Sequence, residues 1–166
     1  MVLENLSKVN SPYSYDEYKE LVIAHAQKGT TSGNDQLIER IEATKINAQR
    51  MTRIEKQVEI KKEISEAVSK ITKNWKWIVI AESWCGDAAQ NIPIIAKIAS
   101  LSPNIKLKIV LRDKNLELMD AYLTNCPRSI PKLICFDSAS KEEIGTWGSR
   151  PVKIQQMVID YKKQNV

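Results

Sequence analysis

The amino-acid sequence predicts an α/β protein with a central four-stranded mixed sheet flanked by helices, preceded by an N-terminal helical extension. Three observations predict this class. Helical periodicity dominates residues 1–73, apolar β-branched segments alternate with helical segments after Asn74, and the last two strand segments are separated by a short turn. The order β-α-β-α-β-β-α describes a parallel unit followed by a hairpin. We therefore expect residues 1–73 to pack as an extension on a sheet domain of residues 74–166.

The extension contains two helical segments. Residues 15–28 place apolar side chains on one stripe, and Gly29 provides a stop signal. After a polar loop, residues 37–73 contain neither Pro nor Gly and repeat apolar residues at three- and four-residue steps. This run predicts one long helix, or two helices with a bend near Ile60.

The remaining elements follow from short apolar runs and turn residues. Strands are predicted where β-branched and aromatic residues gather, and helices where apolar residues recur at helical spacing. The predicted strands span 75–82, 104–112, 132–137 and 142–148, and the predicted helices span 86–100, 115–125 and 151 to about 163. Pro151 suits the first position of the last helix.

Composition excludes several classes of function. The net charge of +5 is spread over both halves of the chain, and 43% of the residues are hydrophobic. Basic residues alternate with acidic ones without interleaved aromatics, so we expect no nucleic-acid binding. No run approaches the roughly 18 apolar residues of a membrane span, and the N-terminus lacks the pattern of a secretion signal, so a cytoplasmic protein is predicted.

The histidine and cysteine pattern predicts no metal centre. The sequence has one His and three Cys residues, and no two of the Cys residues are close enough in sequence for a zinc site. It also lacks a Gly-rich phosphate loop, so no cofactor is expected. His25 lies on the apolar stripe of the first helix, where we expect it to pack rather than to act as a base.

The segment "AESWCGDAAQ" at 81–90 places Cys85 where a strand ends and a helix begins. Free backbone N–H groups and the helix dipole favour a thiolate there, whereas Asp87 opposes one by like-charge repulsion. A small buried packing residue is the alternative. We favour a solvent-accessible thiol. The position three residues later, where a dithiol motif carries its second cysteine, holds Ala88.

These residues resemble the thioredoxin-like superfamily, and more closely the bacterial thioredoxin family proteins with a single-cysteine "WCGDA" motif. The likeness extends through "NAQRMTRIEK" (47–56), "LRDKNLELMDAYL" (111–123), "RSIPKLI" (128–134) and "WGSRP" (147–151). It implies a thioredoxin-like fold in which Cys85 faces a cis-proline at Pro131. Ala88 departs from the dithiol members of the superfamily.

The resemblance also implies a substrate site around Cys85. The residue before the cis-proline, Ile130, would pair with an extended substrate through its backbone. Gly148 would let a substrate backbone approach. The expected substrate-binding residues are Trp84, Gly86, Asp87, Ile130, Pro131 and Gly148, beside Cys85 as nucleophile.

Three arginines near the motif allow more than one role. Arg150 either stabilises the thiolate or pairs with Asp87. Arg50 and Arg53 share a helical face and either reach over the motif or hold Asp113 or Glu82 in salt bridges, and we favour salt bridges.

Two functions remain open. The first is monothiol thiol–disulfide exchange through Cys85, which makes the protein a possible enzyme acting on protein or low-molecular-weight thiols and disulfides. An outside thiol, or Cys126 as a less favoured resolving residue, would then release Cys85. Cys135 is expected to be a packing residue. The second is a redox-inactive module that binds a peptide or protein beside the cis-proline loop. The sequence leaves the oligomeric state open.

Overall fold

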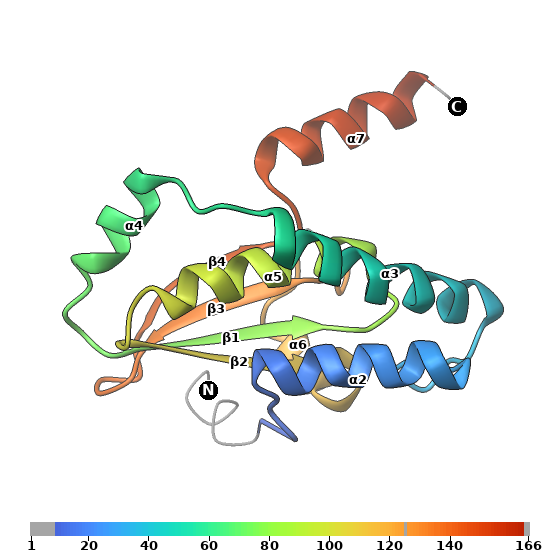
Figure 1. Ribbon diagram of the computed structural model, residues 1–166, viewed down its shortest axis with the longest axis horizontal. Coiled ribbons are helices and arrows are strands. Elements are labelled where there is room, and N and C mark those ends of the chain that lie inside the picture. Colours follow the sequence, from blue (N-terminus) through green and yellow to red (C-terminus); the bar gives the residue numbers. More distant parts are fainter. Residues whose placement is uncertain (1–8, 125, 165–166) are drawn as a thin grey trace.

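The computed structural model describes residues 9–124 and 126–164, and its centre is a four-stranded sheet (Figure 1). The strands are β1 (Trp75–Ala81), β2 (Ile105–Leu111), β3 (Lys132–Asp137) and β4 (Glu143–Gly148), in the order β2-β1-β3-β4. β1 pairs parallel with β2 and antiparallel with β3, and β3 pairs antiparallel with β4. The predicted mixed sheet is therefore confirmed.

Helices surround this sheet and begin and end close to the predicted positions. They are α2 (Tyr15–Lys28), α3 (Ile38–Gln57), α4 (Lys62–Ser69), α5 (Gly86–Ser100), α6 (Leu116–Asp120) and α7 (Val152–Gln164), with a short 3₁₀ turn at Arg112–Lys114. A capping box between Ser14 and Glu17 begins α2. Gly29 ends α2 with a φ of 64°, a left-handed conformation that glycine adopts without strain.

The run 37–73 forms two helices, so the expectation of one long helix is wrong and that of a bend near Ile60 is right. The chain is extended at Val58 and Lys61 although it contains no helix-breaking residue there. The Lys97 ammonium donates a 2.6 Å hydrogen bond to the Val58 carbonyl oxygen, which satisfies an acceptor released at the end of α3. The break lets Val68 of α4 pack on Ala99 and Ile105.

The predicted helix 115–125 is shorter than expected. α6 begins at Leu116, directly after the 3₁₀ segment and Asn115, and ends already at Asp120. Residue 125 lies outside the described residues, as do residues 1–8 of the predicted extension. α7 begins at Val152, one residue after the predicted start at Pro151, and extends away from the sheet and the other helices (Figure 1). None of its residues is buried.

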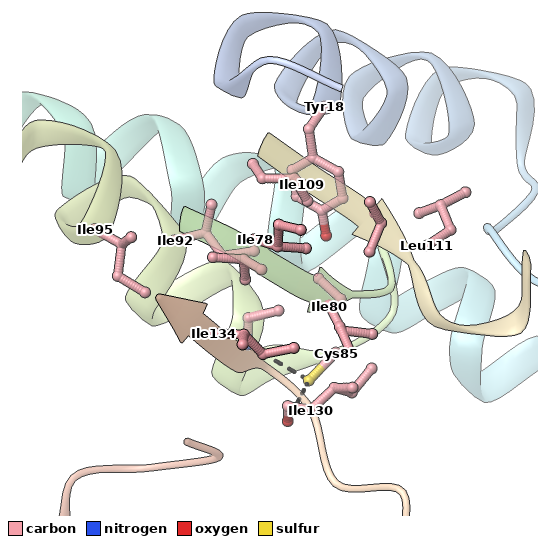
Figure 2. Packing of buried hydrophobic residues seen from close by; sticks show 14 of the residues in the cluster. Tyr18, Ile78, Ile80, Cys85, Ile92, Ile95, Ile109, Leu111, Ile130 and Ile134 are labelled. Carbon is pink, nitrogen blue, oxygen red and sulfur yellow. Dashed lines mark hydrogen bonds between the residues drawn. The ribbon is translucent and has the colours of Figure 1, made fainter. Parts of the chain in front are cut away.

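The hydrophobic core joins the sheet to the first helices (Figure 2). Tyr18 of α2 and Met51 of α3 are buried together with Ile92 of α5 and the inner residues of β1, β2 and β3. α3 packs against both α2 and α5. This packing places one face of α3 beside the amino end of α5, where the Cys85 motif lies. Within the described residues no helix is both long and apolar enough to cross a bilayer.

Candidate functional site

Cys85 is the N-cap residue of α5, at the turn that follows β1. Its backbone is extended, with φ −79° and ψ 112°, and the Ala88 N–H donates to Sγ over 3.4 Å. The Cys85 N–H donates to the Glu82 carbonyl oxygen over 3.1 Å and tightens the turn. A strand-to-helix turn with an N-capping side chain is therefore what positions the sulfur.

The loop that carries Pro131 lies opposite this sulfur. The Ile130–Pro131 peptide bond is cis, and the Cys85 thiol donates to the Ile130 carbonyl oxygen over 3.3 Å (Figure 2). The structure thus brings Cys85 together with Ile130 and Pro131 from across the sheet. The Cys85 thiol therefore already donates a hydrogen bond to the carbonyl oxygen of Ile130, the residue whose backbone we expected to pair with a substrate.

The Cys85 side chain is buried, and the expectation of a solvent-accessible thiol is wrong. Only 8% of the residue is exposed, because Ile130 and the small residues Ala88 and Ala89 pack around it. Desolvation raises the pKa of the Cys85 thiol to about 11, and the nearby Asp87 carboxylate adds to the rise. The Ala88 N–H and the Arg150 charge act in the opposite direction. At neutral pH the resting thiol is therefore protonated.

Arg150 pairs with Asp87. Its Nε and Nη2 atoms each lie 2.7 Å from the Asp87 Oδ2 atom, and its Nη1 donates to Gln155 of α7 over 3.4 Å. Both predicted roles for Arg150 are found, because it pairs with the Asp87 carboxylate and its charge also lowers the pKa of the Cys85 thiol. The pair offsets the repulsion that Asp87 would otherwise exert on a thiolate at Cys85.

Gly148 allows a close approach between β4 and the backbone of the cis-proline loop. Its φ is 130°, and a Cβ atom on it would lie 2.2 Å from the Pro131 carbonyl oxygen. The expected space for a substrate backbone at this glycine is filled by Pro131 itself. Only a residue without a side chain fits here, because β4 passes so close to the cis-proline loop.

Trp84 is half-buried and contacts two arginines through its indole ring. The guanidinium carbons of Arg40 and Arg112 lie 4.3 Å and 4.9 Å from the centre of its indole ring. Cation–π attraction fixes the ring in this position.

The other two cysteines differ from each other in exposure. Cys126 is exposed and Cys135 is half-buried on β3, and both are free thiols, as is Cys85. Burial raises the pKa of the Cys135 thiol. No disulfide links the three, so Cys126 is not joined to Cys85 here.

A buried polar layer lies next to the motif, and the sequence pattern does not predict it. Glu82 is fully buried, accepts a hydrogen bond from the Ser32 hydroxyl and a 2.9 Å bond from the Asp113 N–H, and has a pKa raised by desolvation. Ser83 bonds to Thr31, Thr44 and the Ser32 N–H. The one available signal was the Ser/Thr-rich loop before α3, together with an acidic residue that directly follows a buried strand.

Arg50 lies over the motif, and the favoured expectation of a salt bridge to Asp113 or Glu82 is wrong. Arg112 pairs with Asp113 instead, at 2.9 Å. Arg50 donates from Nη1 to the Asn47 side-chain oxygen over 2.8 Å, and a Cβ on Gly86 would lie 3.1 Å from the same nitrogen. Among the described residues, no group of three or more potential metal ligands gathers anywhere.

The sheet order β2-β1-β3-β4, with a Trp-Cys-Gly turn at the start of a helix and a cis-proline loop opposite, defines a thioredoxin-like protein. Residues 34–162 match a family model described as thioredoxin, and the chain belongs to this family. The match begins before α3, so it includes part of the predicted extension.

Two solved structures share the fold. A protein of unknown function from Pseudomonas aeruginosa has a TM-score of 0.57 and 20% identity, covering 92% of this chain and 89% of its own. An HIV epitope scaffold has a TM-score of 0.55 and 21% identity, covering 89% of this chain and 82% of its own. No curated protein matches the sequence.

Proposed function

We propose that the protein carries out thiol–disulfide exchange through its single motif cysteine, Cys85, with an outside thiol completing the reaction. The placement of Sγ supports this proposal. The sulfur lies between the first turn of α5 and the Ile130 carbonyl, 3.4 Å from the Ala88 nitrogen and 3.3 Å from the Ile130 oxygen. A helix N-terminus stabilises the thiolate that such a reaction needs.

The exchange has two steps. Cys85 loses its proton, and the thiolate attacks one sulfur of a substrate disulfide, so that a mixed disulfide forms and the other substrate half leaves as a thiol. A small outside thiol then attacks the mixed disulfide, restores the Cys85 thiol and retains the first substrate half in a new disulfide. An outside thiol is required because the buried Ala88 offers no second sulfur.

A redox-inactive binding module is the second candidate. The burial of Cys85 and the rise of its pKa to about 11 favour it, because a protonated thiol is a poor nucleophile. In this case the surface beside Ile130 and Pro131 would hold a peptide or protein, and Cys85 would pack the turn.

The same proposal includes the wider context of the protein. We infer a bacterial, cytoplasmic protein whose residues 1–73 extend the domain of residues 74–166. Its proposed partners are thiols and disulfides, either small molecules or proteins. We do not propose nucleic acid or a membrane as a partner.

Peptide mapping with 2-hydroxyethyl disulfide tests the exchange reaction. The protein is incubated with this neutral disulfide between pH 7 and pH 10 and digested without reductant. We expect a mixed disulfide on Cys85 whose rate of formation rises roughly tenfold per pH unit, since the thiolate fraction does so below the pKa. Added 2-mercaptoethanol should remove the adduct and restore the thiol.

The exposed Cys126 is the internal control in this experiment. Modification of Cys126 without any modification of Cys85, even at pH 10, would overturn the exchange reaction. A Cys85→Ala variant that still binds a cellular partner would then support the binding module.

A further inference from the structure

The arginines of this protein divide into two groups. Four of the six pair with a carboxylate, namely Arg40 with Asp35, Arg112 with Asp113, Arg128 with Asp120 and Arg150 with Asp87. Arg50 and Arg53 have no such partner among residues 9–124 and 126–164. Both belong to α3, the helix that packs against α5.

Arg50 is held in place by a chain of hydrogen bonds from the motif itself. The Asn47 side chain, 1% exposed, donates through Nδ2 to the Ser83 carbonyl oxygen over 2.8 Å. Its oxygen accepts the 2.8 Å bond from Arg50 Nη1. The guanidinium is therefore positioned next to Gly86, the residue that follows Cys85, before any ligand arrives.

Three carboxylates of α3 and of the segment around Cys85 already have other partners. Asp87 bonds to Arg150, Glu55 to Lys19 and Glu82 to Ser32. One of the five N–H donors of Arg50 bonds to Asn47, which leaves the rest of its planar fork for an acceptor from outside. A half-buried guanidinium without an acidic partner is an unusual arrangement in this chain.

Arg50 and Arg53 also line a hollow on the surface of α3. The hollow has a volume of ≈ 350 Å³, and Ile46 and Gln49 complete its lining. The two arginines are three residues apart on one helix, so their guanidinium groups are neighbours. The hollow thus combines two positive charges with one apolar side chain.

We propose that Arg50, assisted by Arg53, binds the carboxylate of the substrate that reacts at Cys85. The substrate class is accordingly a small disulfide or thiol that bears a carboxylate group. A guanidinium fork matches a carboxylate through two parallel hydrogen bonds, which an ammonium cannot do. That the bound molecule is a substrate rests on the proposed exchange function. The carboxylate site itself does not depend on redox chemistry.

An unreactive pair of ligands tests the site without any chemistry at Cys85. We expect 3-(methylthio)propanoate to shift the NMR signals of the Gly86 amide and the Arg50 Nε–H group, and its neutral amide to shift them little. Arg50→Gln, which keeps a donor for Asn47, should weaken binding of the acid about three- to tenfold, as for a partly exposed charge-assisted contact. Lys56→Gln removes an exposed cation from the same helix and is the matched control.

A pair of alkylating reagents tests the site next to the reacting sulfur. Iodoacetate and iodoacetamide both transfer a carbon to the thiolate with loss of iodide, but only the first is an anion. The alkylation rate with iodoacetate divided by that with iodoacetamide should be about three- to tenfold higher at Cys85 than at Cys126. In Arg50→Gln the rate ratio at Cys85 should fall to the value at Cys126. Since the ratio cancels any change in the Cys85 pKa, it reports recognition of charge.

The outcomes separate the two proposals. Binding of the acid that Arg50→Gln weakens about three- to tenfold, with no reaction at Cys85, supports the carboxylate site and overturns thiol exchange. Reaction at Cys85 with equal ratios at the two cysteines, and no binding of the acid, supports exchange and overturns the carboxylate site. Loss of binding in Lys56→Gln as large as in Arg50→Gln would show general attraction of anions and would also overturn it.

Discussion

At the scale of single residues, the behaviour of Cys85 depends on neighbours that are far away in sequence. The N-cap position favours a thiolate, as its place at the start of α5 predicts. Ile130 covers the sulfur, and its carbonyl oxygen accepts a hydrogen bond from the Cys85 thiol. Both contacts favour the neutral thiol. Desolvation outweighs the helix end, so the pKa rises.

The two glycines of β4 allow a prediction at the residue scale. Gly148→Ala should destabilise the protein by at least about 2 kcal/mol, because its positive φ strains any side chain and its Cβ would collide with the Pro131 carbonyl oxygen. Urea unfolding at neutral pH measures the loss.

Gly145→Ala is the matched control for this substitution. Gly145 lies on the same strand, a Cβ added to it would meet no atom within 4 Å, and it needs no left-handed conformation. Its cost should stay within about 0.5 kcal/mol. Equal costs for the two alanine variants would contradict the close approach of β4 to the cis-proline loop.

At the scale of the elements, α3 and α7 take opposite places in the molecule. Both carry apolar side chains at helical spacing, yet α3 buries Met51 and Ile54 between α2 and α5, whereas α7 buries nothing. The sequences of the two helices do not show this difference. Only the path of the chain after Gly148, where Arg150 is tied to Asp87, directs α7 away from the sheet.

Methionine truncations measure this difference between the helices. Met51 is 1% exposed and Met157 is 65% exposed. Met51→Ala should lower the free energy of unfolding by about 2–5 kcal/mol, because it removes buried methylenes and leaves a cavity. Met157→Ala should change it by less than about 0.5 kcal/mol. A large cost at Met157 in urea unfolding would contradict the exposed position of α7.

At the scale of the whole molecule, the polar layer around Glu82 and Ser83 connects parts that are distant in sequence. Ser32 comes from the loop before α3, Asn47 from α3, and Asp113 from the turn after β2. Each of them bonds to the segment between β1 and Cys85. The layer therefore joins the helical extension to the motif and sets the position of Arg50.

The buried carboxyl of Glu82 predicts a pH dependence of stability. Its folded-state pKa is raised above the ordinary value of 4.5, mainly by desolvation, so the folded protein holds this proton more tightly than the unfolded chain. Its stabilising contribution is complete below pH 4.5 and is lost as the pH rises through the folded-state pKa. The loss should persist at neutral pH.

Glu82→Gln isolates this contribution, since glutamine cannot ionise. The free energy of unfolding of the variant, relative to the wild type, should increase between pH 4 and pH 7, whatever the constant cost of the altered hydrogen bonds. Urea unfolding at both pH values measures the change. A relative stability that falls or stays constant with pH would contradict a raised pKa.

The order of strands and helices follows from local features of the sequence. The four strands and the turn at Cys85 followed from local periodicity, because alternation along a strand and capping at a helix start depend on residues close in sequence. The family likeness also depended on such local segments. Even the bend near Ile60 was an available alternative.

The protonation state of the Cys85 sulfur and the partners of the arginines, in contrast, depend on tertiary packing. Ile130 covers Cys85 from 45 positions away, and Asn47 holds Arg50 through a bond to Ser83. Burial and pairing depend on which distant surfaces meet, and helical or strand periodicity carries no such information. The fold could therefore be predicted from the sequence. The protonation state of Cys85 and the position of Arg50 depend on tertiary packing and could not.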